Sequence, residues 1–65
     1  MSNEVKKVLK ELSKDSRVSE MYVEGDNVHF ILKDPENNIG DEFLGYKVMY
    51  NDHEEFENEG AVMME

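Results

Sequence analysis

The chain has 65 residues, no cysteine, and sixteen aspartate and glutamate side chains against seven lysines and arginines, which gives a net charge of −9 at pH 7. A chain of this length forms a single domain with a thin core, and without cysteine it has neither a disulfide nor a thiolate zinc site to support that core. The charge disfavours direct contact with nucleic acid or with an anionic membrane and favours a cationic partner.

An amphipathic helix is predicted over residues 3–15. The apolar residues that recur at the spacing of one helical face are Val5, Val8, Leu9 and Leu12. Charged residues such as Lys10, Glu11 and Lys14 interrupt the apolar positions, so the segment is neither a signal peptide nor a membrane span. We therefore expect the protein to stay in the cytoplasm, which is the host cytoplasm if the protein is viral.

A β-hairpin is predicted over residues 18–33, because the sequence changes at Arg17 from helical spacing to an alternation rich in β-branched and aromatic side chains. The turn falls at residues 25–27, which are of types that tolerate a positive φ. The second strand presents one apolar face, formed by Val28, Phe30 and Leu32. We expect that face to meet the helix.

The rest of the chain is predicted as a loop, a third strand and an ambiguous end. Residues 34–41 form the loop, because Pro35 lacks a backbone donor and the asparagines favour local hydrogen bonds. Apolar residues alternate over residues 44–50, which we predict to be the third strand. After a further turn, residues 53–65 form either a fourth strand or an acidic tail.

These elements predict an α+β fold in one domain, residues 1–65, with the N-terminal helix packed on a three- or four-stranded antiparallel meander. One helix covers only one face of the sheet. Tyr22, Ile31 and Met49 fall on the other face, and a second copy of the chain is their simplest cover, so we expect a homodimer. Met63 and Met64 are expected to be exposed and to form an adaptable contact surface. The alternative is that these methionines fill gaps in the core.

Motifs for catalysis are absent from the sequence. It has no cysteine, no threonine and no glycine-rich nucleophile turn. His29 and His53 lack a companion catalytic motif, so each is expected to have a structural or solvated role. A carboxylate pair for acid–base catalysis needs a concave pocket, for which a thin core has little room. We therefore expect no enzymatic activity and no cofactor.

Motifs for metal or phosphate binding are also lacking. Asp34-x-Glu36-x-Asn38 resembles the start of a calcium-binding EF-hand loop, but the glycine is at position 40 instead of directly after Asn38, and Gly45 occupies the twelfth position, where a bidentate glutamate belongs. Weak, nonspecific binding of divalent cations by carboxylates is the alternative. No glycine-rich phosphate motif is present, and the helix lysines are spread around polar faces as on an ordinary solvated helix.

The acidic residues are the functional feature that the sequence offers. Residues 18–65 hold thirteen acids against two lysines. Alternate strand residues lie about 6.5–7 Å apart on one face, so Glu20 and Glu24 share a face, as do the alternate acids of residues 55–59 if that segment is extended. The candidate partner-binding residues are Glu20, Glu24, Asp26, Asp41, Glu42, Asp52, Glu54, Glu55, Glu57 and Glu59. Carboxylates held at such spacing could imitate the repeating charge of DNA, whereas the alternative is a solvated surface that keeps a small protein soluble.

In size, charge and its pattern of one helix with a small sheet, the chain resembles the small early proteins of bacterial viruses that mimic DNA and block host DNA-binding proteins. Among these it looks most like inhibitors of the histone-like nucleoid protein HU. The resemblance covers the whole chain at the level of composition and rests on no motif, so it assigns no residue. It implies a non-enzymatic inhibitor that occupies the DNA-binding surface of a basic protein, with Tyr50, Phe56 and Met63 supplementing the charges.

A second interpretation is an acidic interaction subunit, such as an antitoxin-like or assembly protein, that binds a basic partner by adding a strand along an exposed sheet edge. The two interpretations differ in what they predict for salt and DNA. Mimicry predicts competition with any duplex and a steep dependence on salt. Edge pairing predicts a single partner and a weak dependence on salt.

Overall fold

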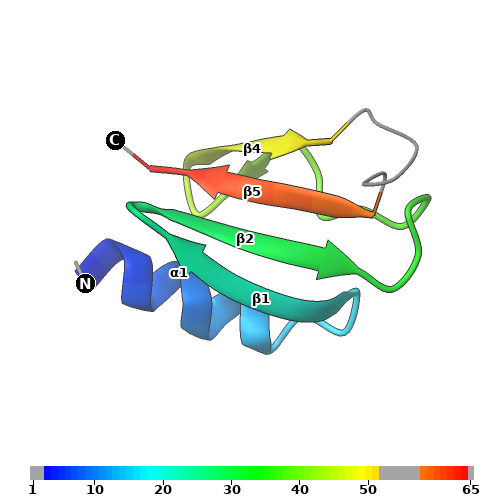
Figure 1. The fold of residues 1–65 in the computed structure, drawn as a ribbon, viewed down its shortest axis with the longest axis horizontal. Helices are drawn as coiled ribbons and strands as arrows, with labels where there is room; N and C mark the ends of the chain where they lie inside the picture. The colour runs from blue at the N-terminus through cyan, green and yellow to red at the C-terminus, as the bar shows by residue number, and fades with distance from the viewer. Residues whose placement is uncertain (1–2, 52–57, 65) are drawn as a thin grey trace.

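The fold is α+β, as the sequence predicts, with one N-terminal helix on one face of a five-stranded antiparallel sheet (Figure 1). This computed structural model describes residues 3–51 and 58–64. Helix α1 spans Asn3–Ser13, two residues short of its predicted end. The Asp15 N–H then donates to the Leu12 carbonyl over 3.0 Å, an i,i+3 bond of the kind that ends helices.

The predicted hairpin is formed by β1 (Val18–Glu24) and β2 (Asn27–Leu32). Strict alternation along β1 would place Val18 on the same face as Glu20. Instead, the pairing register shifts between Val18 and Glu20, which makes Ser19 the extra residue of a β-bulge. The bulge turns Val18 to the other face, where it packs against the buried core.

Of the strand predicted over residues 44–50, only Tyr46–Tyr50 is a strand, β4, and it pairs with a short strand that precedes it, β3 (Glu42–Phe43). Leu44 and Gly45 form the turn between them, with φ angles of 54° and 84°. A two-residue hairpin turn of type I′ requires a positive φ at both positions. Phe43 and Tyr46 flank the turn and pair with each other, so they point to the same side although they are three residues apart. Leu44 is apolar and lies two residues before Tyr46, so the alternation over residues 44–50 does not separate it from the strand that follows.

The C-terminal segment contains β5 (Glu59–Met63), which lies in the middle of the sheet (Figure 1). It pairs antiparallel with β2 on one side and with β4 on the other, so the strand order is β1-β2-β5-β4-β3. The sheet therefore has more strands than the predicted meander, and β5 is inserted out of chain order. Of the two alternatives for residues 53–65, the strand is correct over Glu59–Met63, and residues 53–57 lie outside the described part of the chain.

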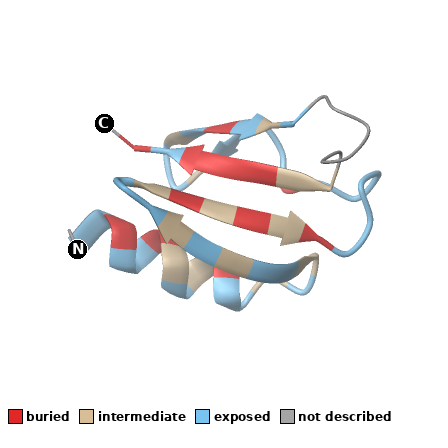
Figure 2. Cartoon of the chain, viewed as in Figure 1, coloured by how far each residue is buried: buried red, intermediate tan, exposed pale blue. Residues whose placement is uncertain are grey.

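The core lies between α1 and the face of β2 that carries Val28, as predicted (Figure 2). The largest fully buried side chains are Phe30, Leu12, Leu32, Val5, Val8, Val28 and Val62. Met64 belongs to the same cluster and is only 7% exposed, so the predicted exposure of this residue is wrong. Its N–H donates to Asn27 Oδ1 over 3.2 Å, which ties the end of the chain to the start of β2.

Gly60 leaves room for the aromatic ring of Phe30 in this core. Gly60 is the cross-strand partner of Phe30 on β2 and of Tyr50 on β4. A Cβ atom at position 60 would lie 2.6 Å from Phe30 Cζ and 2.9 Å from the Met49 carbonyl oxygen. Tyr50 meets the Phe30 ring edge-on, with 5.9 Å between the ring centroids and an interplanar angle of 82°. The packing of these two rings across β5 therefore requires a glycine between them.

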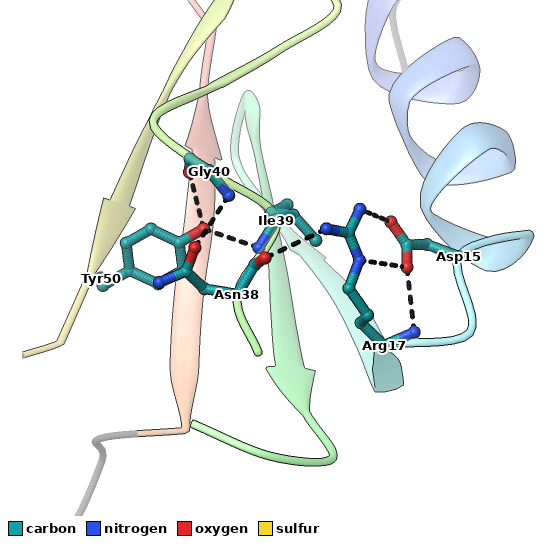
Figure 3. Close-up of polar contacts among 6 residues, drawn as sticks. All are labelled: Asp15, Arg17, Asn38, Ile39, Gly40 and Tyr50. Carbon is teal, nitrogen blue, oxygen red and sulfur yellow. Dashed lines mark hydrogen bonds and ion pairs between the residues drawn. The ribbon is translucent and has the colours of Figure 1, made fainter. Parts of the chain in front are cut away.

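The predicted loop, residues 34–41, contains no strand and is fixed to β4 by Tyr50 (Figure 3). The Tyr50 hydroxyl donates to the Gly40 carbonyl over 2.7 Å and accepts from the Ile39 N–H over 3.1 Å. Burial raises the pKa of the Tyr50 hydroxyl. Ile39 is buried between these contacts and contributes to the core from the loop.

Arg17 fixes the same loop to the end of the helix (Figure 3). Its Nε and Nη2 donate to the two carboxylate oxygens of Asp15 over 2.9 and 2.6 Å, and its Nη1 donates to the Asn38 carbonyl over 3.0 Å. The hydrogen bonds from Arg17 lower the pKa of Asp15, and those to Asp15 raise the pKa of Arg17. The loop is thus fixed to the end of α1 by Arg17 and to β4 by Tyr50. The helix and the loop together cover one face of the sheet, called the inner face below.

Candidate partner-binding face

The face of the sheet opposite α1, called the outer face below, carries a row of side chains from four strands. Tyr22 pairs with His29, His29 with Ala61, and Ala61 with Met49. Because directly paired residues of an antiparallel sheet point to the same side, these four side chains lie next to one another across the sheet. Tyr22 and Met49 are each 46% exposed. The row is therefore apolar and aromatic and is exposed at its two ends, whereas Ala61 inside it is only 7% exposed.

Acidic residues flank this row on both sides. On one side of the row, Ile31 pairs with Glu20 on β1 and with Glu59 on β5, so Ile31 has one glutamate on each side. The Asn51 side-chain amide donates to Glu59 Oε2 over 3.3 Å, which orients this carboxylate without neutralising it. Glu20 has no basic partner among the ion pairs of the described residues. This side of the row carries two charges that a partner can reach.

On the other side of the row, Glu24 pairs with Asn27 at the end of the hairpin, and Lys47 lies between Met63 and Glu42. Lys47 is the one lysine or arginine within the described strands. The outer face is therefore formed by Glu20, Tyr22, Glu24, Asn27, His29, Ile31, Glu42, Lys47, Met49, Glu59, Ala61 and Met63. It combines an apolar centre with a rim in which acids outnumber bases.

Tyr22 and His29 form a stacked pair at one end of the row. Their ring centroids are 4.8 Å apart and their planes differ by 6°. Glu24 Oε2 lies 3.5 Å from His29 Nε2, so one carboxylate of the rim contacts the imidazole. The imidazole therefore has two neighbours on the same face, Tyr22 and Glu24.

The acids predicted to bind a partner fall into three groups. Glu20, Glu24, Glu42 and Glu59 lie on the outer face, and the expected shared face of Glu20 and Glu24 is confirmed. Asp26 lies in the turn between β1 and β2, and Asp41 precedes β3, so neither belongs to the face itself. Asp52, Glu54, Glu55 and Glu57 lie outside the described residues.

Several members of the outer face were not among the predicted site residues. His29 and Ala61 join Tyr22 and Met49 only because β5 is inserted between β2 and β4. The alternation of β2 and of the Ala61 segment would place each on a definite face, but it does not say which strands are neighbours. The place of His29 and Ala61 in the row could therefore not be predicted from the individual strands.

The described surface also contains hollows and scattered histidine, aspartate and glutamate side chains. In the described residues, no group of three or more histidine, aspartate or glutamate side chains is arranged to hold a metal ion. A hollow of about 500 Å³ between α1 and β1 is lined by Lys6, Leu9, Lys10, Ser13 and Met21, and it contains no acid. Two further hollows next to Tyr46 contain one acid or none, so none of the three brings two carboxylates together for acid–base catalysis.

No helix among the described residues is long and apolar enough to cross a membrane. Comparisons of the chain with protein-family models, with the sequences of curated proteins and with solved structures each gave no match.

Proposed function

We propose that this protein is a non-enzymatic, DNA-mimicking binding protein whose outer face occupies the nucleic-acid-binding surface of a basic protein and inhibits it. The observation that carries the proposal is the set of four glutamates around an exposed apolar row, with a single lysine among the strands of that face. A nucleoid protein such as HU is the candidate partner, in line with the class of proteins that the chain resembles. The resulting complex would form in the cytoplasm of the host cell.

The spacing of the acids supports mimicry of a polyanion. Glu20 and Glu59 lie two strands apart, which is about 10 Å, and Glu20 and Glu24 lie four residues apart on one strand, which is about 13 Å. Both separations are longer than the Debye length at physiological salt, about 8 Å, so each carboxylate acts mainly on the basic group nearest to it in the partner. A protein surface that binds DNA phosphates would gain similar energy from such an array.

The apolar row adds contacts that lengthen the lifetime of a complex, which charge alone does not. Electrostatic complementarity raises the rate of association more than it lengthens the lifetime of a complex. Aromatic and methionine side chains at the centre of an interface lengthen that lifetime because they lose water on binding. Tyr22 and Met49 are exposed at the two ends of the row, and Met63 is exposed beside it, so these side chains are suited to this role.

The homodimer expected from the sequence remains a proposal, because a second copy could also cover the apolar row. A two-fold contact through the outer face would bring Glu20, Glu24 and Glu59 of one copy close to the same acids of the other. Like charges facing one another at an interface oppose association. The charge of the face therefore favours a basic partner over a second copy.

The proposal is tested by displacement of DNA from purified HU. Fluorescence anisotropy of a labelled duplex bound to HU should fall when the protein is added, and the effect should weaken steeply as salt is raised. The triple variant Glu20→Gln, Glu24→Gln, Glu59→Gln should compete about tenfold less well, since each lost ion pair contributes up to about 1 kcal/mol. Failure of the wild-type protein to displace the duplex would contradict the proposal.

A matched control separates the outer face from net charge. Glu4→Gln, Glu11→Gln, Glu36→Gln changes the charge by the same amount on α1 and on the loop, away from the outer face. This control variant should compete nearly as well as the wild-type protein. An equal loss in both triple variants would mean that bulk charge acts instead of a defined face.

Strand addition is the second candidate function, because β1 is a seven-residue strand at an edge of the sheet. Its bulge and its two glutamates are features that limit pairing with a foreign strand. In this case the complex would depend weakly on salt and would not be displaced by duplex DNA. The anisotropy experiment thus distinguishes the two candidates.

A further inference from the structure

The stacked pair of Tyr22 and His29 leaves one face of the tyrosine ring open. The two residues are cross-strand partners, so their contact uses the side of the Tyr22 ring that is turned toward β2. β1 is an edge strand, and no strand lies beyond it. The opposite side of the ring is therefore turned toward the edge of the sheet, consistent with the 46% exposure of Tyr22.

Two carboxylates stand on either side of this open ring. Glu20 and Glu24 are the residues two before and two after Tyr22 on the same face of β1, about 6.5–7 Å away along the strand. Both residues are exposed. Glu24 Oε2 lies 3.5 Å from His29 Nε2, and because the Glu24 side chain is 72% exposed it is free to turn toward the open side of the ring. An aromatic face between two carboxylates is a combination that recognises a planar cation by stacking and by hydrogen bonds at once.

We propose that Tyr22, Glu20 and Glu24 form a recognition site for an arginine side chain of the basic partner. The guanidinium stacks on the open face of Tyr22, and its N–H groups donate to the carboxylates of Glu20 and Glu24. The proposal rests on the proposed function, since it names the side chain that the outer face receives from its partner. It adds that Tyr22 is the residue that distinguishes arginine from other cations.

Arginine fits the site better than lysine. The guanidinium is planar, stacks on aromatic rings and carries donors on both edges, whereas the lysine ammonium is a compact and strongly hydrated point charge. A second copy of the chain is a poor source of this group. Its one arginine, Arg17, already donates to Asp15 and to the Asn38 carbonyl. The guanidinium must therefore come from a different protein.

The experiment compares nona-arginine and nona-lysine peptides by NMR titration of the intact protein. The nona-arginine peptide should bind the wild-type protein about two- to fivefold more tightly than the nona-lysine peptide, the range expected for a cation–π contact at an exposed site. Stacking should also move the arginine Hδ resonances upfield, because these protons enter the shielding region of the tyrosine ring. Equal affinity for the two peptides, or no binding of either, would overturn the proposal.

Variants of exposed residues keep the test specific. Tyr22→Leu should lose both the preference for arginine and the upfield shift, while Tyr22→Phe should retain them. Leu44→Met is the control, because it changes an exposed apolar side chain in the turn between β3 and β4, away from the outer face, and it should behave as the wild-type protein. A preference for arginine that survives in Tyr22→Leu would overturn the assignment of Tyr22.

The outcome is separable from that of the DNA-displacement experiment. Displacement of DNA by the wild-type protein and by Tyr22→Leu with equal strength would remove the arginine site and leave the proposed function intact. A preference for arginine that depends on Tyr22, without displacement of DNA, would establish the site and contradict the proposed function.

Discussion

The two faces of the sheet are built by the same strands and differ in what covers them. On the inner face, Phe30 and Val62 are fully buried beneath α1 and the loop that carries Ile39. On the outer face, Tyr22 and Met49 are nearly half exposed and are flanked by acids. In a chain with so thin a core, the inner face must provide the stability, so the outer face is free to carry side chains that serve binding.

A substitution of Gly60, on the inner face, should have the largest effect on stability and tests the difference between the two faces most strongly. Gly60→Ala places a Cβ 2.6 Å from Phe30 Cζ and close to backbone, and overpacking of this kind costs about 1–3 kcal/mol. For a domain of this size that is a large part of the total free energy of unfolding, about 3–10 kcal/mol. Urea denaturation followed by circular dichroism should show a clear fall in the midpoint.

A second substitution shows whether the Phe30 ring is the cause. In the double variant Gly60→Ala, Phe30→Leu, the loss of stability should be smaller than the sum of the two single losses, because the shorter side chain gives way to the new methyl group. Strictly additive losses would mean that the clash lies elsewhere.

Substitution of Tyr50 should give the next largest loss of stability, because Tyr50 fixes the loop that helps to cover the inner face. Tyr50→Phe keeps the edge-on contact with Phe30 but removes the hydrogen bonds to Ile39 and Gly40. We expect a loss of about 1 kcal/mol in the free energy of unfolding, the usual net value for partly exposed hydrogen bonds. Thermal and urea denaturation measure it, and an unchanged midpoint would show that the loop needs no fixation by the hydroxyl.

The outer face should respond in the opposite way. Met49→Ser removes an exposed apolar side chain from one end of the row, and its effect on the free energy of unfolding should stay within about 0.5 kcal/mol. The same substitution should weaken displacement of DNA from HU. A large loss of stability would break the distinction between the two faces, because it would assign a structural role to the outer row.

A small, pH-dependent effect on stability is expected from the ion pair of Asp15 and Arg17. The pKa of Asp15 is lowered in the folded protein, so the pair stabilises the fold above the unfolded pKa, about 3.8, and this contribution is lost as the pH falls through the lowered value. Asp15→Asn should therefore lower Tm by a few degrees at pH 6, and the difference from the wild-type protein should shrink below pH 3.8. A difference that does not depend on pH would contradict this role.

The parts of the fold set by local patterns could be predicted from the sequence. The helical spacing from Val5 to Leu12 and the alternation around residues 25–27 depend on neighbours in the chain, and both elements were located correctly. The insertion of β5 depends on pairing between distant segments, which no local pattern reveals. The turn at Leu44 was hidden because Leu44 is apolar and lies two residues before Tyr46, which is the spacing of one strand face.

The candidate site was predictable in its charge but not in its arrangement. Composition identified the acids, and strand alternation placed Glu20 and Glu24 together. The position of Glu59 beside Ile31, and the row that Ala61 completes, follow from the place of β5 in the sheet. The stacking of Tyr22 on His29 depends on the register of the first hairpin, which alternation alone does not determine.

The most direct test of the outer face as a binding surface is an NMR titration of the isotope-labelled protein with unlabelled HU. The largest amide shifts should map to the outer face, including Glu20, Tyr22 and Glu59, and excess duplex DNA should reverse them. Shifts concentrated on α1, or no shifts at all, would contradict the proposal that this face of the sheet is where the protein meets a basic DNA-binding partner.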